Sequence, residues 1–239
     1  MKRVGFIAGS RIKKWEDWEP SLVDTLYEQD DFLGDILKDE WDVNVGAGCT
    51  VAIVAALRGT VALTTVAGDN LFANLAGELN LNALLSAGIE ARVALDFITL
   101  CTIEVGLVDA KTYANGRAFD DYELTGGLPT PICVNGAIVG FDPTDSPLHP
   151  HLTGVSAIAG VGTVNNLGVD PVAGAFIRLG VRLDVAGNAH YYVNGALLGT
   201  QLLAITPATP LAPWLAISNK AGAIARVHTV DYVKFWQNR

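Results

Sequence analysis

The sequence predicts an all-β protein, an antiparallel β-sandwich or jelly roll. The main observation lies in residues 176–200, where apolar and polar residues alternate from Ile177 to Val185 as in a half-buried strand. Two short apolar runs follow at 190–193 and 196–200, and Asn194-Gly195 between them is typical of a two-residue type I′ turn. Three such strands form a meander whose apolar face requires a second layer, which indicates a sandwich.

The bulk composition fits this fold class. The chain has 239 residues, of which 50% are hydrophobic and 17% charged, and its mean hydropathy is +0.33. This length suits one large sandwich or two small domains, and part of the apolar surplus is expected to be buried between subunits. No stretch approaches the roughly 18 uninterrupted apolar residues of a membrane span, so no membrane insertion is expected.

The net charge limits the classes of binding partner, and the cysteine content indicates the redox compartment. The formal net charge of −9 opposes binding to nucleic acid or to anionic lipid, and no cluster of basic and aromatic residues overrides it. Cys49, Cys101 and Cys133 form no C-x-x-C pair, and the N-terminus lacks a secretory signature. We expect buried free thiols in a chain made in the cytosol; one disulfide with a spare thiol is the alternative.

Residues 1–40 are expected to form a short N-terminal arm, followed by one sandwich domain over 41–239. Between Glu16 and Asp42 the chain carries many acids and a single base, Lys38. One interpretation is a charged strand or loop that packs onto the sandwich through its tryptophans. The other is an extension that docks on a partner, with Trp15 and Trp18 as candidate contact residues.

The remaining strands are predicted from apolar runs bounded by turn residues. They span residues 51–57 and 61–65 (a hairpin through Arg58-Gly59), 90–97, 100–108, 132–141 (with a hairpin at Asn135-Gly136), 155–164, 215–218 and 223–236. Residues 70–88 are ambiguous, because leucines at helical spacing compete with a glycine and four asparagines. Residues 109–131 are expected to form a long loop, and loops of this length often carry function.

Several motifs resemble the concanavalin A-like lectin and glucanase superfamily. They are the hairpin Tyr192 to Gly195 preceded by Arg182-Leu183-Asp184, the strand Val105 to Asp109, the segment Pro210 to Trp214 and the closing run Val230 to Trp236. The resemblance covers the chain from about Trp41 to its end, and it implies a jelly roll. These motifs bear on the fold and not on activity.

Glucanases of this superfamily carry a strand motif, Glu-x-Asp-x-x-Glu, that places a nucleophile and an acid on one face of a strand. Glu28-x-Asp30 has Leu33 at the last position. Glu40-x-Asp42 has Val45 there. No G-x-S-x-G motif occurs either, so we expect no enzymatic activity and assign no catalytic residue.

The short chain, rich in Gly and Ala and with a charged arm, is similar to tailed-phage virion proteins, including capsid decoration proteins. This resemblance implies a non-enzymatic virion structural protein, made in the host cytoplasm, that binds the major capsid protein or another virion protein. It also implies self-association, expected as a homotrimer. The alternatives are a carbohydrate-binding lectin-like or receptor-binding module and a glycan hydrolase or lyase with an unfamiliar site.

The long loop holds the candidate ligand-binding residues. Tyr113, Phe119 and Tyr122 are candidates for stacking on sugar rings, the alternative being a loop folded over its own aromatic residues or a subunit contact. No cofactor is expected except Ca²⁺, for which the candidate ligands, against a solvated acidic loop, are Asp120, Asp121 and Glu123. His190 and His228 fall in predicted strands and are expected on sheet faces.

Overall fold

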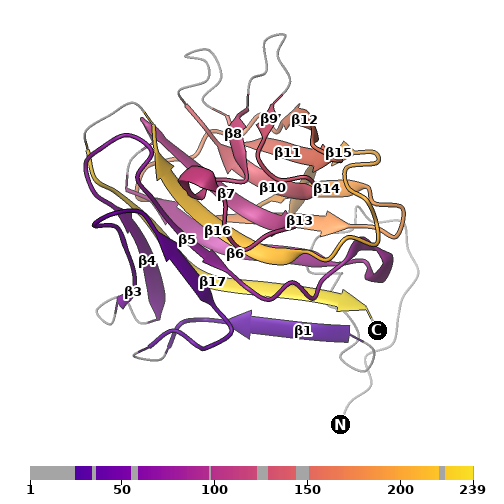
Figure 1. The fold of residues 1–239 in the computed structure, drawn as a ribbon, viewed down its shortest axis with the longest axis horizontal. Coiled ribbons are helices and arrows are strands. Elements are labelled where there is room, and N and C mark those ends of the chain that lie inside the picture. Colours follow the sequence, from indigo (N-terminus) through magenta and orange to yellow (C-terminus); the bar gives the residue numbers. More distant parts are fainter. Residues whose placement is uncertain are drawn as a thin grey trace.

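The protein folds into two antiparallel β-sheets that pack face to face, as Figure 1 shows. The structure is a computed structural model, and it describes residues 25–33, 36–54, 59–96, 98–122, 129–143, 151–220 and 224–238. In these residues there is no α-helix, and no helix has the length and apolar character needed to span a membrane. The predicted all-β sandwich is confirmed.

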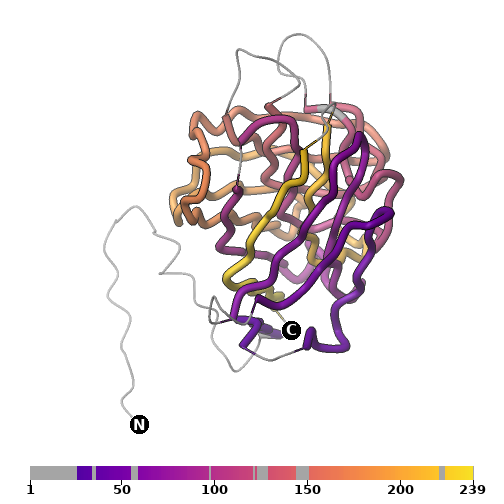
Figure 2. The backbone as a smooth tube through the Cα atoms, turned by 90° about the vertical axis from the view of Figure 1, so that its left-hand side faces the viewer, coloured from indigo at the N-terminus to yellow at the C-terminus, as the bar shows by residue number. Residues whose placement is uncertain are grey.

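The first sheet, called sheet A, has eight strands. In spatial order they are β15 (Ala196–Gln201), β14 (Ala189–Val193), β13 (Ile177–Leu183), β6 (Gly88–Leu95), β17 (Arg226–Asn238), β4 (Thr60–Thr65) and β3 (Thr50–Val54), with β1 (Thr25–Asp30) paired to β17. Figure 2 shows β17, in yellow, running beside indigo strands from the start of the chain. Sheet A therefore joins segments far apart in the sequence.

The second sheet, called sheet B, has seven strands. In spatial order they are β12 (Val161–Asn166), β11 (Thr153–Ile158), β10 (Gly136–Phe141), β7 (Cys101–Val108), β16 (Ala212–Asn219), β5 (Phe72–Ala76) and β2 (Asp42–Val45). A small hairpin of β8 (Phe119–Asp121) and β9 (Thr130–Pro131) and two 3₁₀ turns, η3 (Ala83–Leu85) and η4 (Ala114–Gly116), complete the described elements.

The main core lies between the two sheets, and the period-two alternation of the strands determines which residues enter it. On β7, Cys101, Ile103, Val105 and Leu107 are buried against the residues of sheet A. The residues between them point to the outer face of sheet B. All three cysteines are buried and free, as expected from the sequence.

The predicted meander is confirmed as β13, β14 and β15. Asn194 and Gly195 have φ values of 50° and 81°, which is the left-handed geometry of a type I′ turn. The Asn194 side chain accepts a hydrogen bond from the backbone N–H of Arg178, which ties this turn to the neighbouring strand. The hairpin of β3 and β4 is also present, with Gly59 at φ 90° before β4.

Three sequence-based details differ from the structure. Residues 155–164 are a hairpin of two strands and not one strand, because Ala159 and Gly160 take positive φ values of 51° and 77°. Asn135-Gly136 is no hairpin turn, since β10 begins at Gly136 and continues to Phe141. Residues 70–88 contain β5 and η3, so the leucine spacing there reflects neither a helix nor wholly irregular structure.

Part of the expected N-terminal arm belongs to sheet A. Residues 25–30 form β1, which pairs with β17 in antiparallel register, and Leu26 packs against the main core. The Asp30 carboxylate accepts a hydrogen bond of 2.8 Å from Trp41 Nε1 and lies 3.4 Å from Lys38 Nζ. Trp15 and Trp18 lie outside the described residues, so their docking role stays a prediction.

One side of the sandwich carries no charged strand. There β15 ends sheet A and β12 ends sheet B, and the two edge strands contact each other. The last two strands of each sheet on this side, β11 and β12 in sheet B and β14 and β15 in sheet A, contain no Asp, Glu, Lys or Arg. Figure 1 shows β12 and β15 close together at this side of the molecule.

Candidate functional site

The outer face of sheet B is the candidate site, because residues 109–122 and 129–135 fold over it. Their aromatic residues form a second hydrophobic cluster with outward residues of β16, β10 and β11. Phe119 and Trp214 in this cluster are fully buried. The predicted long loop is thus a packed layer that covers the sheet in the described residues.

Glu104, on the outer face of β7, anchors this layer. Its Oε2 accepts hydrogen bonds from the Ala118 N–H at 2.8 Å and from Trp214 Nε1 at 2.7 Å. Its Oε1 accepts from the Phe119 N–H and the Tyr122 hydroxyl, both at 2.9 Å. One carboxylate therefore joins β7, β16 and the covering segment.

All four groups that form hydrogen bonds with the Glu104 carboxylate are donors. The residue is fully buried, and burial raises the pKa of its carboxyl group, while the four hydrogen bonds oppose that rise. Burial and the nearby Glu104 likewise raise the pKa of the Tyr122 hydroxyl, which stays protonated and donates to Glu104. With every donor directed at it, the carboxylate acts as a structural acceptor.

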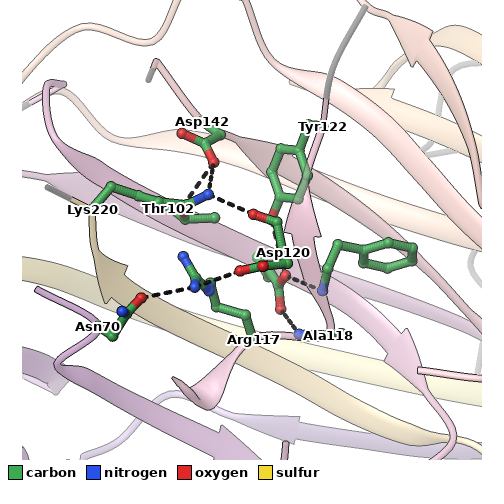
Figure 3. A network of polar contacts seen from close by, with 10 residues as sticks. Asn70, Thr102, Arg117, Ala118, Asp120, Tyr122, Asp142 and Lys220 are labelled. Carbon is green, nitrogen blue, oxygen red and sulfur yellow. Dashed lines mark hydrogen bonds and ion pairs between the residues drawn. The ribbon is translucent and has the colours of Figure 1, made fainter. Parts of the chain in front are cut away.

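A second group of charges surrounds Asp120 (Figure 3), next to Ala118, whose N–H donates to Glu104. The Arg117 guanidinium, nearly fully buried, contacts the Asp120 carboxylate at 2.5 Å and donates to Asn70 Oδ1 at 3.0 Å. Lys220 Nζ lies 2.9 Å from the buried Asp142 carboxylate and donates to the Asp120 carbonyl oxygen. These contacts tie β8 to the ends of β16 and β10.

Unused hydrogen-bonding groups lie under the same layer. Among the described residues, no partner is present for either side-chain polar atom of Asn74, for Ser218 Oγ, or for Nε and Nη1 of Arg117. Asn74 and Ser218 point outward from the neighbouring strands β5 and β16, and η4, which precedes Arg117, contacts both strands. Amide, hydroxyl and guanidinium groups are those that pair with the hydroxyls of a polar ligand.

The next outward position on β7 is Gly106, and it has no room for a side chain. A Cβ atom there would lie 2.2 Å from the Ala137 carbonyl oxygen and 2.6 Å from the Ile138 Cα. A second carboxylate two residues after Glu104 is therefore sterically excluded. Asp109, at the end of the strand, accepts hydrogen bonds from the Tyr113 hydroxyl and the Asn135 N–H.

The predicted sugar-stacking residues all lie in the covering layer. Phe119 and Tyr122 are buried and meet edge to face, with ring centroids 6.4 Å apart. Tyr113 is half-buried, and its ring packs edge-on against Trp214 at 5.3 Å. This is the arrangement of a loop folded over its own aromatic residues, so sugar stacking by these three residues stays a prediction that requires the layer to move.

The calcium hypothesis also stays a prediction. Asp120 is paired with Arg117, the side chain of Asp121 is not described, and Glu123 lies outside the described residues. In the described part of the chain no three His, Cys, Asp or Glu residues are grouped so that they could hold a metal ion.

A small pocket of about 90 Å³ lies where β1 and β17 meet the segment around Trp41, and no residue of the group around Glu104 lines it. Its lining is Glu28, Glu40, Trp41, Gly77, Glu78, Asn80 and Phe235. Burial and the nearby Glu40 raise the pKa of Glu28. The size of the pocket suits water or a very small ligand and not a glycan chain.

Comparison with known proteins defines the class of fold. No model of a known protein family matches the sequence, and no curated protein matches it. Solved structures do match: a Bacillus licheniformis beta-glucanase has a TM-score of 0.59 at 13% identity, covering 92% of this chain and 100% of that one. The carbohydrate recognition domain of Emp47p has a TM-score of 0.58 at 13% identity, covering 97% and 100%.

Peanut lectin is similar to the same extent, with a TM-score of 0.60 at 11% identity over 90% of this chain and 98% of that one. The fold is therefore the jelly roll of the concanavalin A-like lectins and glucanases, as the sequence motifs indicated. At these identities the likeness concerns the fold alone.

Sequence reasoning recognised the strand that contains Glu104 but not its role. A carboxylate inside an otherwise apolar strand is a signal for a buried polar contact, because such a group is rarely buried without partners. The partners themselves lie 14 to 110 residues away along the chain, which no local pattern reveals.

Proposed function

We propose that this chain is a non-catalytic binding protein built on a lectin-type jelly roll. One observation carries the proposal: Glu104 is saturated by four donors, and Gly106 leaves no space for a second carboxylate beside it. Hydrolysis of a glycosidic bond by the carboxylate-pair mechanism needs two free carboxyl groups across the scissile bond. A role in ligand binding requires no pair of free carboxyl groups.

The ligand class that we propose first is carbohydrate. The similar structures include a carbohydrate recognition domain and a lectin, and the outer face of sheet B holds the unpaired groups of Asn74, Ser218 and Arg117. A glycan would reach them only after residues 109–122 are displaced. Because that displacement costs free energy, we expect weak binding, with a Kd of about 1 mM.

A glycan array followed by titration of each hit tests this function. Asn74→Ala and Tyr113→Ala are expected to weaken binding, whereas the matched control Tyr27→Ala, on β1 in sheet A, leaves it unchanged. Loss of binding in the control as well, or silence across the array, contradicts carbohydrate recognition. Release of sugar from any array glycan contradicts the non-catalytic assignment.

The second candidate is the virion structural protein that the sequence resemblance implies. It is favoured by the uncharged side formed by β12 and β15, because such a surface suits contact between protein subunits. In this role the protein would bind a capsid protein and itself, and residues 1–24 with Trp15 and Trp18 would dock on the shell.

Binding to purified shells tests this candidate. The informative truncation removes residues 1–24 and keeps β1, because loss of Thr25–Asp30 also removes a strand of sheet A. Loss of shell binding with an unchanged Tm supports the docking role. Shell binding equal to that of the full chain contradicts it.

A further inference from the structure

The uncharged side of the sandwich is distinguished by its exposed apolar residues. Leu197 on β15 is 51% exposed, and Leu202 and Leu203 in the turn that follows are 67% and 66% exposed. Val161 on β12 and Val185 in the turn after β13 are also largely exposed. Contiguous apolar residues at the surface of a folded protein mark an interaction site more often than scattered ones do.

These residues belong to one continuous surface. The turn at Leu203 is joined to the turn after Val185, because the Leu203 N–H donates to Asn188 Oδ1 and the Ala204 N–H donates to the Gly187 carbonyl. Strand β15 contacts β12 across the two sheets. The leucines of β15 and its turn, with Val185 and Val161, thus form what we call the leucine edge.

The leucine edge lacks the usual protection of an edge strand. Exposed edges are normally shielded by charged residues or proline, and neither β12 nor β15 contains one. On the opposite side β3, which ends sheet A, is likewise free of charge and proline, whereas β2, which ends sheet B, begins with Asp42, and Asp42 pairs with Lys111. Only a register shift at Leu198 interrupts the regular ladder of β15.

The distribution of charge indicates which molecule binds to the leucine edge. Two copies of a chain with net charge −9 repel each other, and this repulsion is weakest at the leucine edge, because its strands carry no charged residue and the Asp184 carboxylate at its margin is hydrogen-bonded to Asn188 and lies 3.5 Å from His190 Nε2. A surface that is uncharged and apolar is also complementary to itself about a two-fold axis. A basic protein would be drawn to the acidic surfaces instead.

We propose that the leucine edge is a contact between two copies of this chain related by a two-fold axis. The contact rests on leucine side chains, because the register shift at Leu198 limits pairing of the main chains. The inference does not depend on whether the ligand is a glycan or a shell protein. The proposed pair of subunits differs from the homotrimer that the sequence resemblance implies.

The mass in solution, measured by sedimentation equilibrium on the full chain, tests this contact. We expect twice the chain mass of 25.2 kDa, and a rise in the dissociation constant of about 30-fold or more for Leu197→Lys combined with Leu203→Lys. The matched control is Val43→Lys combined with Val45→Lys, which adds the same charge at exposed positions of β2, the strand that ends sheet B on the opposite side, and keeps the dimer.

A cross-linking experiment gives an independent readout. The native thiols of Cys49, Cys101 and Cys133 are buried, so a cysteine introduced as Leu197→Cys is the accessible one. Mild oxidation should produce a chain of doubled mass on a non-reducing gel, whereas Val43→Cys, on the exposed face of β2, should not. A monomeric wild-type protein, a trimer, or a dimer that survives both lysine substitutions at the edge would overturn the proposal.

Discussion

At the scale of single residues, Glu104 shows how one buried carboxylate organises a layer of the molecule. Its four hydrogen bonds come from two backbone N–H groups, an indole and a phenol. A buried carboxylate with no partners would be very costly, whereas one that satisfies four donors fixes where the covering segment lies. Glu104 therefore has a structural role, on a sheet face where an enzyme of similar fold could carry catalytic residues.

Glu104→Gln is expected to lower the free energy of unfolding by about 3 kcal/mol or more. The introduced amide nitrogen would replace either Oε2, which faces two N–H donors, or Oε1, which faces the Phe119 N–H and the Tyr122 hydroxyl, so at least one buried N–H would lose its acceptor together with the charge that it binds. Urea unfolding measures the change. Asp231→Asn, which removes a partly exposed partner of Arg92 on sheet A, is the matched control and should cost less than about 1 kcal/mol. Equal losses in the two variants would contradict the role of Glu104.

His228 gives a prediction of pH dependence. The residue is fully buried in β17, and burial lowers the pKa of its imidazole from 6.5 to about 4. Between these values the unfolded chain binds the proton more tightly than the folded chain, so stability is present above pH 6.5 and is lost as the pH falls toward 4.

The expected loss from His228 is about 3 kcal/mol across this range. His228→Leu should flatten this part of the stability profile, measured as the free energy of urea unfolding at a series of pH values. The comparison between variant and wild type cancels the carboxyl groups that titrate in the same range. A profile unchanged by the substitution would show that the imidazole is not the group responsible.

At the scale of elements, the strands of the meander could be predicted from the sequence because local patterns determine them. Strict alternation from Ile177 and the Asn194-Gly195 turn need no information from elsewhere in the chain. The turn at Ala159-Gly160 was missed because alanine rarely adopts a positive φ, so its sequence carries a weak turn signal. Polar contacts between distant segments, such as those of Glu104, have no local signature at all.

Strand β1 gives a prediction about truncation. Its six residues pair with the C-terminal half of β17, and Leu26 packs on the core. A chain that lacks residues 1–30 should therefore be less stable by about 3 kcal/mol than one that lacks residues 1–24, since it loses a strand and a buried leucine. Thermal unfolding of the two truncated proteins measures the difference. Equal Tm values would contradict a structural role for β1.

At the scale of the whole molecule, the distribution of charge matters more than its total. The net charge of −9 makes two copies repel each other, while strands β11, β12, β14 and β15, which lie on one side, contain no Asp, Glu, Lys or Arg. Composition alone showed an apolar surplus and suggested that subunits bury it. To locate the exposed apolar residues on the surface, the arrangement of both sheet edges had to be known.

Salt should strengthen association of this protein with itself. Added salt screens the repulsion between two copies of net charge −9, whereas an apolar contact has no ion pairs to lose. Raising NaCl from roughly 50 mM to roughly 500 mM is therefore expected to lower the dissociation constant measured by sedimentation. Weaker association at high salt would indicate an ionic interface and contradict the leucine edge.

The order of the strands also governs how the molecule reaches its native state. The last two strands along the chain, β16 and β17, lie inside sheets B and A, where β16 separates β5 from β7 and β17 separates β4 from β6. Until both have been synthesised, each sheet is two unconnected halves with open edges. Each sheet is therefore complete only after β16 and β17 have been synthesised, and folding is expected to be slow because most contacts join distant parts of the chain.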